Sequence, residues 1–205
     1  MVETEVGKRY DVFVWDSETS GLGNKAEILE FGGVLLDGET FEEKDSILSL
    51  IRPSKPSVLE TDDAKKALSM NHLAERKDEL LEAPTKHEFL QKWWKMRQKH
   101  RKQWIPGGYN LGNFDMPKLR YLFWQIREEK PLFKIDDFFH YHILDAMCVY
   151  IANNWFTGKS RYVRLRDACQ AYGVKNTKAH SAIADARATA ELLRRMMLPE
   201  YVNNI

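Results

Sequence analysis

The chain has 205 residues, of which 43% are hydrophobic and 30% charged, and its formal net charge at pH 7 is +1. This composition predicts one folded domain over residues 1–205 and excludes a disordered, collagen-like or low-complexity chain. With 31 basic and 30 acidic residues, the chain lacks the overall basicity that attracts nucleic acid non-specifically.

The sequence contains no signal for a membrane or a secreted protein. No apolar run approaches the roughly 18 residues that a membrane helix needs, and the first residues lack the basic start and apolar stretch of a signal peptide. Two cysteines, Cys148 and Cys169, are too few for a disulfide scaffold. We therefore expect a cytoplasmic protein that does not contact a membrane.

The first part of the chain predicts three consecutive strands. Residues 10–15 contain a continuous apolar run from Val12 to Trp15, which is typical of a central strand covered on both faces. A second strand is expected at residues 28–36 and a third at about residues 46–52. Three successive strands indicate a meander.

A helix is expected after Pro84. The segment Thr85-Lys86-His87-Glu88 has the pattern of a capping box. The residues that follow at spacings of four, three and four predict one buried stripe: Phe89, Trp93, Met96 and His100. A second row on this helix is basic and is most simply a solvated face: Lys92, Lys95, Lys99 and Lys102.

The remaining sequence predicts two more strands among helices. Strands are expected at residues 104–109 and 138–143, and helices at residues 145–156, 165–172 and 183–197. Between the two strands, a helix with Pro117 in its first turn is expected to bury Leu119, Leu122, Phe123 and Ile126. The core stripe expected of the last helix is Ile183, Ala186, Ala190, Leu193 and Met197. The pattern predicts a mixed α/β fold.

Two carboxylates follow the first predicted strand. Asp16 and Glu18 are two residues apart, so in an extended chain both point to the same side. Two like charges this close favour a cation between them, and all-oxygen ligands favour Mg²⁺ or Mn²⁺ over zinc. Taken alone, the pair is more typical of an exposed loop, where Asp-x-Glu is common.

Three further residues lie at the ends of predicted elements. Asp115 stands where a strand gives way to a helix, a position that also suits a simple helix N-cap. His180 precedes the last helix, and Asp185 falls in the first turn of that helix, where an acid ordinarily complements the helix dipole. If both serve one site, His180 must lie on the loop, because five helical residues would place them on different faces.

These elements occur together and in order, and as a set they resemble a known family. The segments 15–22 (WDSETSGL), 108–115 (GYNLGNFD) and 180–185 (HSAIAD) look like the three exonuclease motifs of the DEDDh (DnaQ-like) 3′-to-5′ exonucleases. The resemblance extends from about Tyr10 to Arg195, with mild departures such as Ser17 and Ser20 where threonines are usual. It implies a ribonuclease H-like fold: a five-stranded mixed sheet with the second strand antiparallel to the others and helices on both faces.

The resemblance also implies a mechanism and a set of site residues. It makes Asp16, Glu18 and Asp185 the ligands of one metal ion, with Asp16 bridging to a second ion near Asp115, and His180 the general base. Two cations, Mg²⁺ or Mn²⁺, suit phosphodiester hydrolysis because they stabilise charge on the attacking and leaving oxygens. The expected products are nucleoside 5′-monophosphates, released one at a time from a free 3′ end.

Contacts to the nucleic acid follow from the same motifs. Gly21 allows a backbone to approach the terminal nucleotide, and Leu22 resembles an apolar wedge against the last bases, although it equally suits a core leucine. The other predicted substrate contacts are Thr19, Asn110, Asn113 and Lys178. Arg161, Arg164 and Arg166 approach the His180 loop in sequence and offer a basic feature for the rest of the strand. His140 and His142 alternate, but no third ligand of matching type is adjacent, so we expect them to be structural.

The sequence therefore predicts a metal-dependent 3′-to-5′ exonuclease that acts on single-stranded nucleic acid, with DNA favoured over RNA. The alternatives are an exoribonuclease of the RNase T or oligoribonuclease type, and a catalytically silent module that holds nucleic acid or a partner protein. A polymerase proofreading subunit is disfavoured because little chain follows Asp185. The oligomeric state is not predicted.

Overall fold

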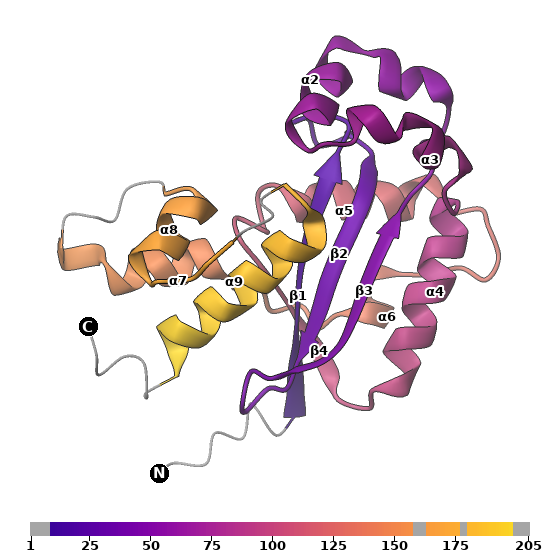
Figure 1. Cartoon of the computed structure of the whole chain (residues 1–205). Coiled ribbons are helices and arrows are strands. Elements are labelled where there is room, and N and C mark those ends of the chain that lie inside the picture. Colours follow the sequence, from indigo (N-terminus) through magenta and orange to yellow (C-terminus); the bar gives the residue numbers. More distant parts are fainter. Residues whose placement is uncertain (1–8, 158–162, 177–179, 199–205) are drawn as a thin grey trace.

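A computed structural model describes residues 9–157, 163–176 and 180–198, and its centre is a five-stranded sheet of order β3-β2-β1-β4-β5 (Figure 1). The strands are β1 (Tyr10–Thr19), β2 (Ile28–Leu36), β3 (Glu43–Leu50), β4 (Gln103–Gly108) and β5 (Leu144–Asp145). Strand β2 is antiparallel to both β1 and β3, whereas β1, β4 and β5 are parallel. This is the predicted mixed sheet of the ribonuclease H-like fold.

The helices follow the first three strands along the chain, and β4 and β5 stand among them. The α-helices are α2 (Asp62–Met70), α3 (Lys77–Glu82), α4 (Lys86–Lys99), α5 (Asp115–Gln125), α6 (Ile135–Phe138), α7 (Ala146–Asn153), α8 (Leu165–Ala171) and α9 (Ala182–Met197). Three short 3₁₀ turns are η1 (Pro56–Glu60), η2 (Ala74–Arg76) and η3 (Trp155–Thr157). No helix of the described residues is both long and apolar enough to cross a membrane.

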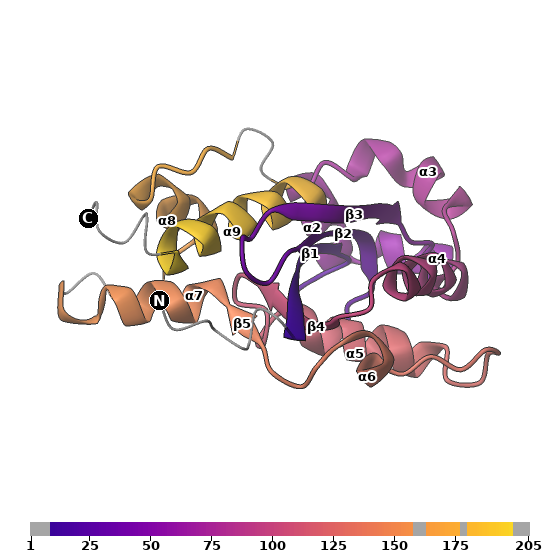
Figure 2. The ribbon, with the colours of Figure 1, turned by 90° about the horizontal axis from the view of Figure 1, so that it is seen from below.

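Alternation along β1 divides the interior into two apolar layers. Phe13 and Trp15 belong to a cluster with the buried residues of α4, α5 and α6. Val12 and Val14 point to the opposite face and belong to a cluster with α7, α8 and α9. Helices therefore cover both faces of the sheet, as Figure 2 also shows.

Helix α4 confirms its predicted start and three of the four residues of its predicted buried stripe; the fourth, His100, follows the helix and is only partly buried. The hydroxyl of Thr85 accepts from the backbone of Glu88, and the Glu88 carboxylate accepts from the backbone of Thr85, which completes the capping box. Phe89, Trp93 and Met96 are buried. In α5, the four residues expected to face inward are also buried: Leu119, Leu122, Phe123 and Ile126.

One prediction about secondary structure and one about a core position are wrong. Residues 138–143 do not form the fifth strand, because Phe138 ends helix α6 and Phe138 and Phe139 fill the core; the fifth strand is the short β5 that follows. In α9, Met197 is 41% exposed and Met196 is buried in its place. The helices α2 and α3 had not been predicted, and they lie at the edge of the sheet where β1 ends and β2 begins (Figure 1).

Candidate metal-dependent active site

The end of β1 carries the first two acids of the site. The strand continues past the predicted end at Trp15, because β2 pairs with β1 in register through Asp16, Ser17 and Glu18. Asp16 and Glu18 therefore point to the α9 face of the sheet, while Ser17 between them points to the other face. The extended backbone holds the two carboxylates on one side, as the sequence predicted.

Helix α9 brings the third acid to this face through a close contact with β2. Gly32 of β2 is the register partner of Asp16. A Cβ atom at Gly32 would lie 2.2 Å from the backbone nitrogen of Ile183, so only glycine lets the start of α9 approach this closely. Asp185 follows Ile183 by two residues in the first turn of α9, and its carboxylate lies close to that of Asp16.

The three acids form a group with the donors of a metal site. One carboxylate oxygen from each of Asp16, Glu18 and Asp185 lies within 4.8 Å of the others, and all three residues are half-buried. Among the described residues, no lysine, arginine or histidine forms an ion pair with any of the three. Three uncompensated carboxylates need a cation, and an all-oxygen set suits Mg²⁺ or Mn²⁺. The residues present therefore fit a divalent hard cation.

The pKa values show the mutual repulsion in this cluster. Burial, followed by the charges of Asp115, Glu18 and Asp185, raises the pKa of Asp16 well above its ordinary value. Burial and then the charge of Asp185 raise the pKa of Glu18 to about 8. Burial also raises the pKa of Asp185. In the absence of a cation, the cluster therefore holds protons that a metal ion would displace.

Glu30 is an acid of the site that the sequence analysis missed. It is buried in β2 opposite Glu18, and its charge adds to the upward pKa shifts of Asp16 and Glu18. One oxygen of Glu30 accepts from the backbone of Ala182 at 3.0 Å, which caps the start of α9, and the other accepts from Arg76 at 3.2 Å. The sequence did contain a signal for this residue, because Glu30 is the one acid in the apolar strand β2.

Asp115 approaches the site from the opposite face of the sheet. It is buried at the start of α5 and accepts a hydrogen bond of 2.6 Å from the hydroxyl of Ser17. Burial raises its pKa to about 7, against the lowering by Ser17 and by the nearby charge of Lys118. Asp115 lies outside the group of three oxygens within 4.8 Å, but its charge is the second cause of the raised pKa of Asp16. Asp16 therefore stands between Asp115 and the other two acids.

His180 lies on the loop before α9, as predicted, and its side chain is exposed. Its backbone has a left-handed conformation, with φ of 67°. In this conformation the backbone N–H donates to Asp185 at 3.0 Å. This bond ties the backbone of His180 to Asp185, and the imidazole is exposed.

Two side-chain amides that the sequence analysis missed orient the acids. Asn176 donates to Asp185, and Asn71 hydrogen bonds to Glu18; both bonds lower the pKa of the acid concerned. Asn71 is buried at the end of α2, and Asn176 lies just after α8. A lone asparagine in a loop has no periodicity, so only the tertiary structure reveals these contacts.

The turn after β1 holds three of the predicted substrate residues. Thr19 is buried, and its hydroxyl donates to the carbonyl of Gly21 at 2.8 Å, so it shapes this turn. Gly21 packs near Asp63 of α2. Leu22 is 82% exposed, which makes the core-leucine interpretation wrong.

The loop before α5 holds two more. Asn110 has a left-handed backbone and Asn113 is exposed; the amide of Asn113 donates to the side-chain oxygen of Asn110 at 3.2 Å. Asp145 supports the loop by accepting from the backbone of Asn110 at 2.9 Å. Lys178 and Arg161 lie outside the described residues.

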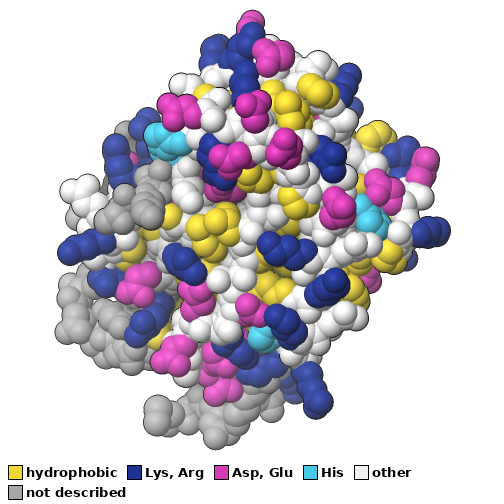
Figure 3. Space-filling view, turned by 45° about the vertical axis from the view of Figure 1, so that its right-hand side comes forward, with side chains coloured by type: hydrophobic (Ala, Val, Ile, Leu, Met, Phe, Trp, Pro, Cys, Tyr) yellow, Lys and Arg dark blue, Asp and Glu magenta, His cyan; other side chains and the backbone are white. Residues whose placement is uncertain are grey.

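The predicted basic features are largely engaged elsewhere. Lys92 donates to the carbonyl of Leu48, and Lys102 lies within ion-pair distance of Asp11 and Asp37. Arg166 pairs with its neighbour Asp167. Figure 3 shows basic and acidic side chains interspersed over the face it presents. On that face the described surface has no extended field of one sign.

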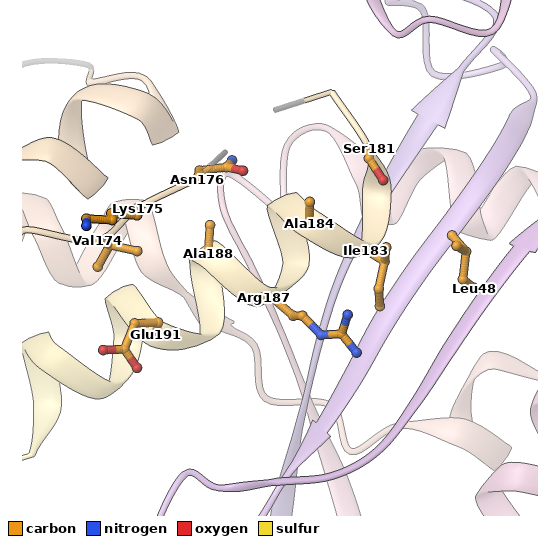
Figure 4. A pocket seen from close by; sticks show the side chains of 10 residues that line it. All are labelled: Leu48, Val174, Lys175, Asn176, Ser181, Ile183, Ala184, Arg187, Ala188 and Glu191. Atoms are coloured by element: carbon orange, nitrogen blue, oxygen red, sulfur yellow. The ribbon is translucent and has the colours of Figure 1, made fainter. Parts of the chain in front are cut away.

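A groove of about 480 Å³ borders the site along α9 (Figure 4). It lies between Leu48 of β3 and the segment Val174 to Asn176, and Arg187 projects into it. Arg187 pairs with Glu43 through two bonds of 2.9 and 3.1 Å. Asn176 and Ser181 belong to both the groove wall and the surroundings of Asp185.

Comparison with known families gives one match, which covers most of the chain. Residues 13–193 match the model of the RNase T family, described as exonuclease. No sequence among the curated proteins matches significantly.

Solved structures with the same fold are exonucleases. A structure of exonuclease I has a TM-score of 0.70 at 17% identity, over 95% of this chain and 43% of that one. Exonuclease I of E. coli, in a zinc-bound complex with single-stranded DNA, has a TM-score of 0.69 at 17% identity, over 96% of this chain and 42% of that one. The nuclease domain of 3′hExo, a DEDDh family member bound to rAMP, has a TM-score of 0.65 at 18% identity, over 91% of each chain. The chain spans less than half of the length of the exonuclease I structures.

Proposed function

The chain belongs to the RNase T family of exonucleases, and on this premise we propose that it is a metal-dependent 3′-to-5′ exonuclease of single-stranded nucleic acid. It releases nucleoside 5′-monophosphates from a free 3′ end. The observation that carries the proposal is the group of three half-buried carboxylates from β1 and α9, which forms no ion pair with a described lysine or arginine.

The acids divide into two sets of metal ligands. Asp16, Glu18 and Asp185 would hold one ion, and Asp16 and Asp115 would hold a second; Mg²⁺ and Mn²⁺ fit these oxygen donors equally. When bound, such ions supply a water that is acidic at neutral pH and stabilise charge on the phosphate. The protein contributes fixed positions for the ligands through Ser17, Asn71 and Asn176.

His180 acts as the general base in this proposal. Its ring is exposed, and its charge acts on Asp185, whose pKa it lowers. Histidine is the side chain that exchanges protons near neutral pH. The hydrogen bond from the His180 backbone to Asp185 keeps the loop that carries the base next to this metal ligand.

The terminal nucleotide is held by the two loops beside the carboxylates. Leu22 is exposed and offers an apolar edge to the last bases, and Thr19 fixes the turn through its bond to the carbonyl of the buried Gly21. Asn110 and Asn113 offer amides to sugar or phosphate. Lys178 adds a cation next to the His180 loop.

We favour DNA over RNA as the polymer. The segment Gly108-Tyr109-Asn110 and the run Arg164-Leu165-Arg166 resemble the single-strand DNA exonucleases of the family, and the exonuclease I of E. coli cited above was solved with single-stranded DNA. The competing support comes from 3′hExo, whose nuclease domain was solved with rAMP. A cytoplasmic location stays a prediction.

A catalytically silent binding module is the second candidate. A module that only holds a strand has no need of buried, mutually repelling carboxylates, since their burial is unfavourable without a cation. The presence of all five expected side chains, including His180, therefore favours the enzyme.

The decisive experiment follows 5′-labelled single-stranded DNA and RNA of one sequence at single-nucleotide resolution, with Mg²⁺ or Mn²⁺ and with a chelator. We expect a descending ladder on DNA that needs the metal. Asp16→Asn should slow it by more than about a hundredfold, because it removes a charge shared by both ions.

Asp16→Asn also removes a repelled buried charge, so its melting temperature without metal should equal or exceed that of the wild type. His142→Ala, an exposed histidine at the opposite end of β1, is the matched control and should keep full activity. A ladder on RNA but not on DNA would show that the substrate is RNA. Metal-independent strand binding without shortening would overturn the exonuclease in favour of the binding module.

A further inference from the structure

His72 occupies an exposed position at the edge of the carboxylate cluster. It follows Asn71, the buried residue that ends α2 and hydrogen bonds to Glu18. The side-chain oxygen of Asn71 accepts from the backbone of Leu73 at 3.4 Å, so the chain on both sides of His72 is tied down. The position of His72 relative to Glu18 is therefore fixed by its neighbours.

The ring of His72 faces the ring of His180. Their centroids lie 6.4 Å apart, and their planes are inclined by 59°. The two residues come from the end of α2 and the start of α9, two segments that lie on either side of the end of β1 (Figure 1).

The backbone of His72 has a conformation that is uncommon for residues other than glycine. Its φ is 57°, in the left-handed region, where glycine is the ordinary residue and a side chain costs energy. The side chain is exposed and, among the described residues, makes the ring contact with His180 and no hydrogen bond. Packing therefore does not explain a histidine here, and an unexplained strained residue beside an active site indicates a functional role.

The charged groups around the site indicate what His72 could do there. A phosphodiester that approaches the carboxylates needs donors on its outer side, in addition to any metal ions. Two cations contact the described part of the site, and both are engaged: Arg76 with Glu30 and Glu79, and Lys118 with the carbonyl of Phe114. The imidazoles of His72 and His180 are exposed beside the cluster and can donate to a bound phosphodiester.

We propose that His72 is a substrate-contacting residue whose imidazole N–H donates to a non-bridging oxygen of the scissile phosphodiester, opposite His180. The proposal rests on the proposed exonuclease function and extends it. His72 contributes to holding the strand, whereas His180 takes part in the chemical step. Removal of the His72 ring should therefore weaken substrate binding and leave the maximum rate nearly unchanged.

The left-handed backbone supplies a clean variant. Glycine adopts this conformation without strain, so His72→Gly removes the ring and should not lower the melting temperature. We expect a KM on the order of tenfold higher for a single-stranded oligonucleotide, with kcat within about twofold of the wild type. His72→Asn, which also tolerates φ near 57° and keeps an N–H donor, should recover part of the loss.

Two further variants separate the possible outcomes. His180→Ala should lower kcat by at least about a hundredfold, and His142→Ala should change neither parameter. Wild-type KM and kcat in both His72 variants would overturn the role of His72 while leaving the exonuclease intact. A fall in kcat with unchanged KM would also overturn it, because His72 would then act in the chemical step. A wild type that shortens neither DNA nor RNA would instead refute the proposed function, and the His72 proposal with it.

Discussion

Asn176 fixes the orientation of a carboxylate in the cluster with a single amide. It donates to one oxygen of Asp185, while the other oxygen accepts from the backbone of His180. Both donors lower the pKa of Asp185 against the increase that burial causes. Because both oxygens are engaged, the carboxylate cannot rotate freely, and it remains directed at Asp16 and Glu18.

Loss of this amide should weaken metal binding without unfolding the protein. We expect Asn176→Ala to lower kcat/KM by about 10- to 100-fold and to raise the Mg²⁺ or Mn²⁺ concentration that gives half-maximal rate, as is typical when a partner of a metal ligand is removed. A metal titration of the exonuclease rate measures both effects. The control is Asn154→Ala, whose amide donates to the carbonyl of Tyr150 at the end of α7. Identical metal titrations for wild type and Asn176→Ala would show that Asp185 needs no such support.

At this scale, sequence patterns predict only residues that belong to a motif. Asp16 and Glu18 follow from a spacing of two in a strand, and the structure places them together with Asp185. Glu30 and Asn176 have no such spacing, since each is defined by a contact with a distant part of the chain. Their roles depend on packing, which a local pattern does not encode.

At the scale of elements, the site depends on how closely α9 approaches β2. The contact lies at Gly32, where a Cβ atom would come within 2.2 Å of the backbone of Ile183 and 2.4 Å of that of Ala182. Backbone atoms cannot move aside as a flexible side chain can. The start of α9, which carries Asp185, is therefore positioned by the absence of a side chain on β2.

Gly32→Ala should disturb both stability and activity. The added methyl group must push α9 away from the sheet, so we expect the free energy of unfolding to fall by roughly 2 kcal/mol or more, as for an overpacked core. The exonuclease rate should fall as Asp185 moves away from Asp16. Denaturant unfolding and the ladder assay measure the two effects.

Gly112→Ala is the matched control for this variant, because a Cβ atom there meets nothing within 4 Å. Its unfolding midpoint should equal that of the wild type. Equal stability of Gly32→Ala and Gly112→Ala would mean that α9 is not held by this contact.

The elements that could be predicted from the sequence are those with strong periodicity. The strand at Ile28–Leu36 and the capped helix α4 match the predictions closely. The predicted strand at residues 138–143 failed because alternating aromatic and histidine residues imitate a strand, whereas Phe138 and Phe139 are buried by tertiary packing. The highly charged α2 was missed, although Thr61 caps its first turn through Ala64.

For the whole molecule, the main electrostatic feature is local rather than global. The net charge is +1, and charges of both signs are mixed on the face in Figure 3. At the end of β1, by contrast, four acids repel one another: Asp16, Glu18, Asp115 and Asp185. The stability of the whole chain should therefore depend on whether this cluster carries protons, a metal ion or neither.

The sign of this dependence follows from the raised pKa values. Glu18 has a pKa of about 8 in the folded chain and an ordinary value of 4.5, and Asp115 has about 7 against 3.8. Between these limits the folded state binds more protons than the unfolded state. Without metal, the free energy of unfolding should therefore decrease as the pH rises from about 4 to about 8.

A divalent cation should reverse this trend, because it binds the deprotonated cluster and must displace protons at low pH. We expect the rise in melting temperature caused by Mg²⁺ or Mn²⁺, relative to a chelator, to be larger at pH 8 than at pH 5.5. Thermal unfolding of the full chain at both pH values measures it, with Glu18→Gln as the control. This variant lacks the group with the pKa of about 8, so its metal-free stability should vary less with pH. Equal metal effects at both pH values would mean that the cation binds elsewhere, since only a site made of these protonated acids links metal binding to pH in this direction.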